Sequence, residues 1–184
     1  MLEGLTKAAM IELISREFSD VSRKGGVSWS EAWIIDKYGS MEEMLAARSS
    51  DTDQTWLEVA QREEWRTWEH CPWSFLDKIG FRYYLVAAVM RFLLTGEDCL
   101  ESSFFTFKFY NSNYDSFTRG QLVALGEYLR YRAELPRREA LMMVLDEADM
   151  SWEDYVASGE TWTPEAWSDW QEPLEIWQKF LASS

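Results

Sequence analysis

The chain has 184 residues, a length typical of one globular domain, and 47% of them are hydrophobic. Its formal net charge of −14 argues against binding nucleic acid, because an acidic surface repels phosphates. The longest apolar run, within residues 85–94, is interrupted by Arg91 and is far shorter than the ~20 residues of a membrane span. No secretory pattern opens the sequence, so we expect a cytoplasmic protein without a membrane partner.

Aromatic residues make up 16% of the chain and include 11 tryptophans, which is enough to build a sizeable core. Trp29, Trp33, Trp56, Trp65 and Trp68 are expected in that core. The two cysteines, Cys71 and Cys99, are expected as reduced, packed thiols. The sequence leaves open a disulfide between them.

Helix signals are frequent in the first half of the chain. Residues 5–18 place apolar side chains near a 3.6-residue period, and Gly25-Gly26 breaks the chain after them. Two capping boxes predict the next two helix starts: Ser28 with Glu31, and Ser40 with Glu43. Gly39 is expected to end the first of these helices.

Two further helices are expected before residue 95. One covers residues 54–68, opened by Asp51 or Asp53 and closed by Pro72. The other, over residues 81–94, shows the clearest helical period and is predicted to be the central core helix. The face predicted to be buried carries Phe81, Tyr84, Leu85, Ala88 and Phe92.

The second half of the chain is also mainly helical. Thr118 with Gln121 opens a helix, which Pro136 is expected to separate from another. Thr163-Pro164 predicts the start of a last helix, kinked or restarted by Pro173. Residues 103–110 alternate with period two, which indicates a short strand or an extended loop. The sequence therefore predicts that residues 1–184 form one all-α domain, a bundle-like array of about seven to nine helices with at most one short strand pair.

Acidic residues are concentrated near the C-terminus. Residues 139–178 hold eleven Asp and Glu, five Trp and no Lys, Arg or His. We expect this acidic, Trp-rich part, residues 139–184, to be folded, with acids on the surface and tryptophans anchoring it. A helical stripe is expected to face the body of the protein or a partner: Trp167, Trp170, Leu174, Trp177 and Leu181. The predicted partner-binding residues are Asp146, Glu147, Asp149, Trp152, Glu153 and Asp154.

Known catalytic patterns are missing from the sequence. His70 is the only histidine, which removes two-histidine metal sites, and no Gly-x-Ser-x-Gly nucleophile elbow is present. The Gly25-Gly26 pair lacks the Lys-Ser/Thr of a phosphate-binding loop. We therefore expect no catalytic residue, no metal and no cofactor, and we retain one candidate pocket formed by Asp77, Arg82 and His70.

The block Ser74–Met90 carries a Phe-Leu-Asp-x-x-Gly-Phe-Arg-Tyr-Tyr pattern. It resembles the central block of an uncharacterised bacterial family of acidic helical proteins, with weaker similarity over residues 28–132. The resemblance implies a fold and a bacterial source but no activity. Within the block, Asp77 is expected to cap the following helix or pair with Arg82, and Gly80 to allow a tight turn.

These observations favour a non-enzymatic binding protein that neutralises a basic protein partner, such as an immunity protein against a bacterial toxin. The alternatives are a cytosolic structural or regulatory interaction protein, an enzyme with an unrecognised carboxylate site, and a small-ligand-binding protein.

Overall fold

The computed structural model describes residues 5–63, 65, 72–106, 111–147, 150–151, 154, 157–158 and 168–183. Within these residues the fold is all-α, as predicted, with seven α-helices, three short 3-10 helices and no strand. The α-helices are α1 (Lys7–Glu17), α2 (Trp29–Asp36), α3 (Met41–Ser50), α4 (Trp56–Ala60), α5 (Lys78–Thr95), α6 (Arg119–Glu147) and α8 (Gln171–Ser183). The 3-10 helices are η1 (Pro72–Phe75), η2 (Ser102–Phe105) and η3 (Asn111–Ser116).

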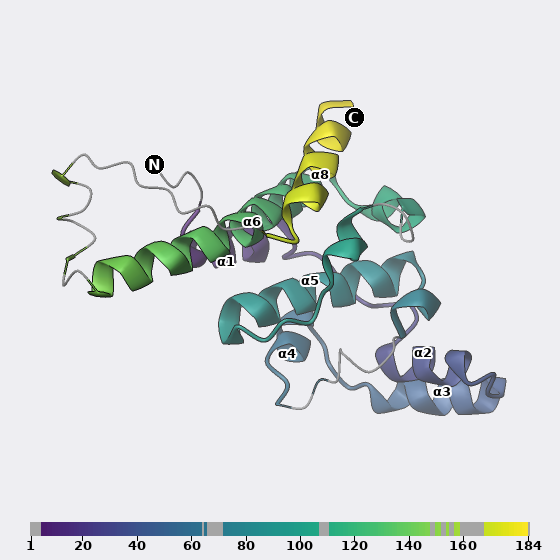
Figure 1. The fold of residues 1–184 in the computed structure, drawn as a ribbon. Coiled ribbons are helices and arrows are strands. Elements are labelled where there is room, and N and C mark those ends of the chain that lie inside the picture. The colour runs from purple at the N-terminus through teal and green to yellow at the C-terminus, as the bar shows by residue number, and fades with distance from the viewer. Residues whose placement is uncertain are drawn as a thin grey trace.

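Helix α5 is the centre of the fold (Figure 1). Asp77 caps its N-terminus by accepting a hydrogen bond of 2.8 Å from the Gly80 amide, and Gly96 ends it in the left-handed conformation. The prediction of a central core helix is confirmed, but burial extends well beyond the predicted face. Tyr83, Val86 and Met90 are also buried, whereas Phe92 is only partly buried. The apolar period of the sequence predicts only one buried face, whereas α5 is packed against other elements on more than one side.

The other helices surround α5 in two groups. Helices α1, α4 and η3 pack directly against it, and α6 packs against α1 and α8. Helices α2 and α3 lie side by side at one end of the molecule, where α2 contacts η1 (Figure 1). Buried side chains from every described element except α3 form one contiguous hydrophobic cluster.

Aromatic rings fill two regions of this core. Around α2, the Trp29 ring lies 5.4 Å from Trp65, 5.1 Å from Trp73 and 5.1 Å from Tyr84. Under α8, Trp177 is completely buried, and its indole N–H donates to the Leu122 carbonyl over 2.9 Å. Of the expected core tryptophans, Trp29, Trp56 and Trp65 are buried and Trp33 is partly buried, whereas Trp68 lies outside the described residues.

The C-terminal stripe faces the body of the protein. Trp170, Leu174 and Trp177 are buried and Leu181 packs against the core, while Trp167 lies outside the described residues. Pro173 lies in the first turn of α8, where its missing N–H costs no helical hydrogen bond. The predicted start at Thr163-Pro164 falls on residues that the structure does not describe.

The capping boxes at Ser28 and Ser40 are confirmed, but the helix expected over residues 54–68 is wrong in start and extent. Thr55 is its N-cap, and α4 ends at Ala60. Asp51 and Asp53 cannot serve as caps because their carboxylates are used in a buried ion-pair network described below.

Helix α6 runs through Pro136 without ending there, contrary to prediction. An ion pair of 3.0 Å between Arg138 and Glu134 spans the proline, and Arg138 also lies over the Tyr131 ring. These contacts link the residues before and after Pro136 within one helix. In the region expected to alternate as a strand, residues 102–105 form η2 instead, and residues 107–110 lie outside the described part of the chain.

The turn after α2 also differs from the prediction. Tyr38, rather than Gly39, takes the left-handed conformation, with φ of 56°. The Tyr38 and Gly39 amides donate to the carbonyls of Ile35 and Ile34, the pattern of a Schellman motif. Gly39 is still required, because a Cβ there would overlap the Ile34 side chain. Tyrosine is costly in this conformation, and its side chain is 96% exposed and gains little packing.

We predict that Leu85→Ala lowers the free energy of unfolding by about 2–5 kcal/mol, because Leu85 is fully buried in α5. Leu94→Ala, in the exposed last turn of the same helix, serves as the control and should cost less than about 1 kcal/mol. Urea denaturation measures both. Equal losses for the two variants would contradict the central position of α5.

We predict that Tyr38→Gly raises the free energy of unfolding by about 0.5–1 kcal/mol, because glycine adopts a positive φ without steric cost. Tyr38→Ala keeps the Cβ and should bring no gain. Thermal denaturation of both variants would reveal the difference, and a destabilised glycine variant would show that the tyrosine side chain makes a stabilising contact.

Candidate functional site

The C-terminal part of α6 presents an exposed face of unusual composition. Met142 is 57% exposed and Met143 is 66% exposed. Glu139 and Asp146 are also exposed. The four positions are spaced i, i+3, i+4 and i+7, so they share one helix face, which we call the methionine–acid face. This part of α6 extends away from α2–α5 (Figure 1).

The opposite side of the same helix is buried. Leu141 and Leu145 are each only 3% exposed, which fixes the orientation of α6. The two methionines therefore face solvent because the helix buries its leucines. Methionine is a flexible, polarizable side chain that adapts to differently shaped apolar partners.

The predicted partner-binding residues are only partly described. Asp146 and Asp154 are exposed, and Asp154 is held by Ser151, whose hydroxyl donates to its carboxylate over 2.6 Å. Glu147 is the last residue of α6, but its side chain lies outside the described part of the structure. The same holds for Asp149, Trp152 and Glu153. The exposure of Met142 and Met143 was not predicted, although their i+3 and i+4 spacing from Glu139 is visible in the sequence.

All acids of the C-terminal tract with described side chains are exposed: Glu139, Asp146, Asp154, Asp169, Glu172 and Glu175. None of them forms an ion pair with a described residue. Their charges therefore act on solvent and on whatever approaches the surface.

The candidate pocket of Asp77, Arg82 and His70 is not formed by the two described members. The Asp77 carboxylate accepts hydrogen bonds from the amides of Gly80 and Val27, over 2.8 and 3.1 Å. The predicted cap is thus confirmed, and the carboxylate also ties the loop before α2 to α5. Arg82 donates to the Ser116 carbonyl over 2.6 Å instead of pairing with Asp77, and His70 lies outside the described residues.

Gly80 has a different role from the predicted tight turn. It lies inside α5, where a Cβ would overlap the Val27 carbonyl. The glycine therefore permits the close approach of the loop before α2 to the helix.

A buried polar network that the sequence did not suggest joins the loop after α1 to the segment between α3 and α4. Asp53, whose side chain is 1% exposed, pairs with Arg62 and lies 3.6 Å from the Nε atom of Arg23. The Tyr83 hydroxyl also donates to Asp53, over 2.7 Å. Burial and this hydrogen bond raise the pKa of Tyr83 far above its usual value, so the hydroxyl stays a donor.

The neighbouring Asp51 is equally occupied. Its carboxylate accepts hydrogen bonds from the Ser30 amide and hydroxyl, each of 2.9 Å. Its carbonyl accepts a hydrogen bond of 2.8 Å from Arg23. An open cavity of about 330 Å³ lies beside this network. It is lined by Ser22, Arg23, Lys24, Gly25, Gly26, Arg48, Asp51, Asp53 and Gln54.

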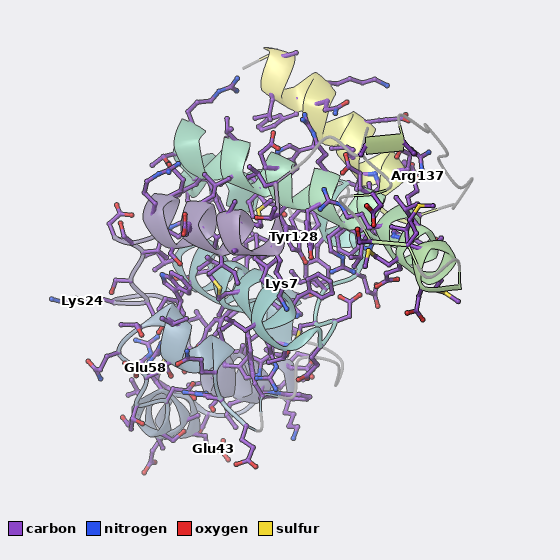
Figure 2. All side chains as sticks on the ribbon, turned by 90° about the vertical axis from the view of Figure 1, so that its left-hand side faces the viewer. Lys7, Lys24, Glu43, Glu58, Tyr128 and Arg137 are labelled. Carbon is purple, nitrogen blue, oxygen red and sulfur yellow. The ribbon has the colours of Figure 1, made fainter. Side chains whose placement is uncertain are left out.

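Arg132 is a buried cation with a structural role. Its guanidinium lies 3.9 Å from the ring centroids of both Phe92 and Trp170, so it is sandwiched between them. It also donates to the Tyr128 hydroxyl over 2.9 Å and pairs with Asp98. Figure 2 shows Tyr128 inside the molecule. Arg132 therefore joins the segment before α8 to α5 and α6.

The described residues form neither a metal-binding cluster nor a membrane-spanning helix. No group of three or more His, Cys, Asp and Glu side chains is placed to hold a metal ion. Among the same residues, none of the helices has both the length and the hydropathy needed to cross a membrane. Cys99 is buried, and Cys71 lies outside the described part.

Comparison with known families identifies the chain at the level of a family. The sequence model of a family of unknown function, DUF6714, matches residues 6–156. The chain belongs to DUF6714. The match reaches further in both directions than the expected similarity over residues 28–132, and it includes all of α6 but not α8. No curated protein and no solved structure matches this DUF6714 chain.

We predict that Arg132→Met lowers the free energy of unfolding by about 2–4 kcal/mol. The variant loses two cation–π contacts and leaves the buried Tyr128 hydroxyl without its partner. Arg130→Met removes a partly exposed arginine from the same helix and should change stability by less than about 0.5 kcal/mol. Guanidinium denaturation compares them, and similar small losses would show that the sandwich contributes little.

Proposed function

We propose that the protein is a non-enzymatic binding protein that docks a basic, partly apolar protein partner on the methionine–acid face of α6. The observation that supports it is the exposure of Met142 and Met143 between Glu139 and Asp146 on one helix face, where neither carboxylate forms an ion pair with a described residue. Apolar side chains give a partner area to bury, and the flanking acids select for a cationic one.

The chemistry of the face argues for a protein partner. Two neighbouring methionines can adapt their shape to an apolar side chain of a partner protein. A site for a polar small molecule would instead present fixed polar groups. The lack of Lys, Arg and His over residues 139–178 means that no nearby cation of the tract competes for the carboxylates. Long-range attraction from the other exposed acids would raise the rate of encounter.

An immunity protein that blocks a basic bacterial toxin is one form of this function, and a regulatory interaction protein is the other. Both use the same face, and they differ in the partner. In the first case the partner is a cationic enzyme whose active site is covered. In the second it is a protein of the same cell that has no toxicity.

The test begins with capture of the partner by cross-linking at position 142 or 143, followed by binding kinetics of purified variants. Glu139→Gln with Asp146→Asn should lower the association rate about fivefold at low salt, because steering is lost. Met142→Ala with Met143→Ala should raise the dissociation rate about tenfold, because apolar contact area is lost.

A matched control removes two exposed acids elsewhere, Glu42→Gln with Glu63→Gln, and changes the net charge by the same amount. Rates close to wild type are expected for it. If the control slows association as much as the α6 charge variant, the effect belongs to the net charge and the face is not the docking site.

A further inference from the structure

The cavity between the loop after α1 and the end of α3 has a solvent side and a buried side of opposite charge. Asp51 and Asp53 form the buried side, with side chains only 6% and 1% exposed, and both are already neutralised by the arginines and hydrogen bonds around them. The solvent side carries Arg48, 42% exposed, and Lys24. A ligand entering from solvent therefore meets cations first, in a chain of net charge −14.

The two arginines of the cavity are held in fixed positions. Arg48 makes a two-pronged contact with Glu31, through Nε over 2.8 Å and Nη2 over 2.6 Å, and its Nη1 has no partner among the described residues. Glu31 is itself fixed by the Ser28 amide. Arg23 is held through Nη2 by the Asp51 carbonyl. A ligand bound to the remaining N–H groups would order little that is not already ordered.

Lys24 and the glycines complete the surroundings of the cavity. The Lys24 side chain extends into solvent beside the cavity and makes no ion pair with a described residue (Figure 2). Gly25 has φ of 88°, and a Cβ there would meet nothing within 4 Å, so the backbone is open to an approaching molecule. The volume of about 330 Å³ is at the lower end of the range of small-molecule sites.

We propose that this cavity binds a small anionic molecule through its phosphate or carboxylate oxygens. Arg48 and Arg23 would donate to the oxygens from fixed guanidinium groups, and Lys24 would close over the ligand from outside. The site is separate from α6, so it does not depend on the proposed function.

The experiment is calorimetric titration of the full chain with two probes, inorganic phosphate and succinate, at constant ionic strength. Saturable binding of at least one probe is expected. If phosphate alone binds, the ligand class is a phosphate compound. If succinate alone binds, the ligand class is a dicarboxylate. If both bind, the site recognises negative charge. The absence of saturable binding by either probe would overturn the proposal.

Three variants locate the site. Lys24→Gln should weaken binding about threefold to tenfold without affecting the fold, because Lys24 makes no ion pair with a described residue. Arg48→Gln should abolish binding, and its circular dichroism spectrum shows whether the fold survives the loss of the Glu31 contact. Lys179→Gln, an exposed lysine on α8, is the matched control and should bind as wild type does.

Nuclear magnetic resonance provides a second readout that does not depend on the variants. The amide signals of Gly25 and Gly26 should shift during the titration, while those of Gly96 and Gly126 should not. Equal weakening by Lys24→Gln and Lys179→Gln, or shifts confined to other glycines, would place the anion elsewhere and refute the site.

Discussion

The burial of α5 on almost every side is the constraint on which the rest of the structure depends. A helix buried over most of its length must be covered by other elements, and here α1, α4 and η3 pack against it. Two hydrogen bonds also attach the chain near the start of α2 to α5. Asp77 at its start binds the Val27 amide, and the Tyr84 hydroxyl accepts a hydrogen bond of 2.9 Å from the Trp29 amide. The loop before α2 and the first residue of α2 are thereby attached to the core helix.

Positive and negative charges are used differently in this protein. Arg91 and Arg132 are buried, where Arg91 donates to the carbonyls of Ala60 and Arg62 and pairs with Glu97. The cations thus hold loops and helices together from inside. The buried carboxylates of Glu31, Asp51 and Asp53 are compensated by other arginines, namely Arg48, Arg62 and Arg23. The described acids of the C-terminal tract have no such partner and stay exposed, because an unpaired buried carboxylate is costly.

Local signals in the sequence were sufficient at three helix starts. The capping boxes at Ser28 and Ser40 and the cap at Asp77 need only residues three apart. Features that depend on distant residues were missed. Asp51 reads as a cap unless its distant partners Ser30 and Arg23 are known. Pro136 was misread for a different reason, because the contacts of Arg138 that span it lie within the same helix. The exposed methionines could have been predicted, since Leu141 and Leu145 are their neighbours in the same helix and mark its buried side.

Helix α3 buries none of its residues, and this has a consequence for how the molecule opens. Its stability comes from the cap at Ser40, its packing along α2 and the contact between Arg48 and Glu31. Opening α3 exposes little apolar surface, so its amide hydrogens should exchange with solvent through local unfolding of this helix. The amide hydrogens of α5 should exchange only when the whole protein unfolds. Since Arg48 belongs to α3, this local opening also dismantles the cavity beside Asp51. Occupancy of the cavity and the exchange rate of α3 are thus thermodynamically linked.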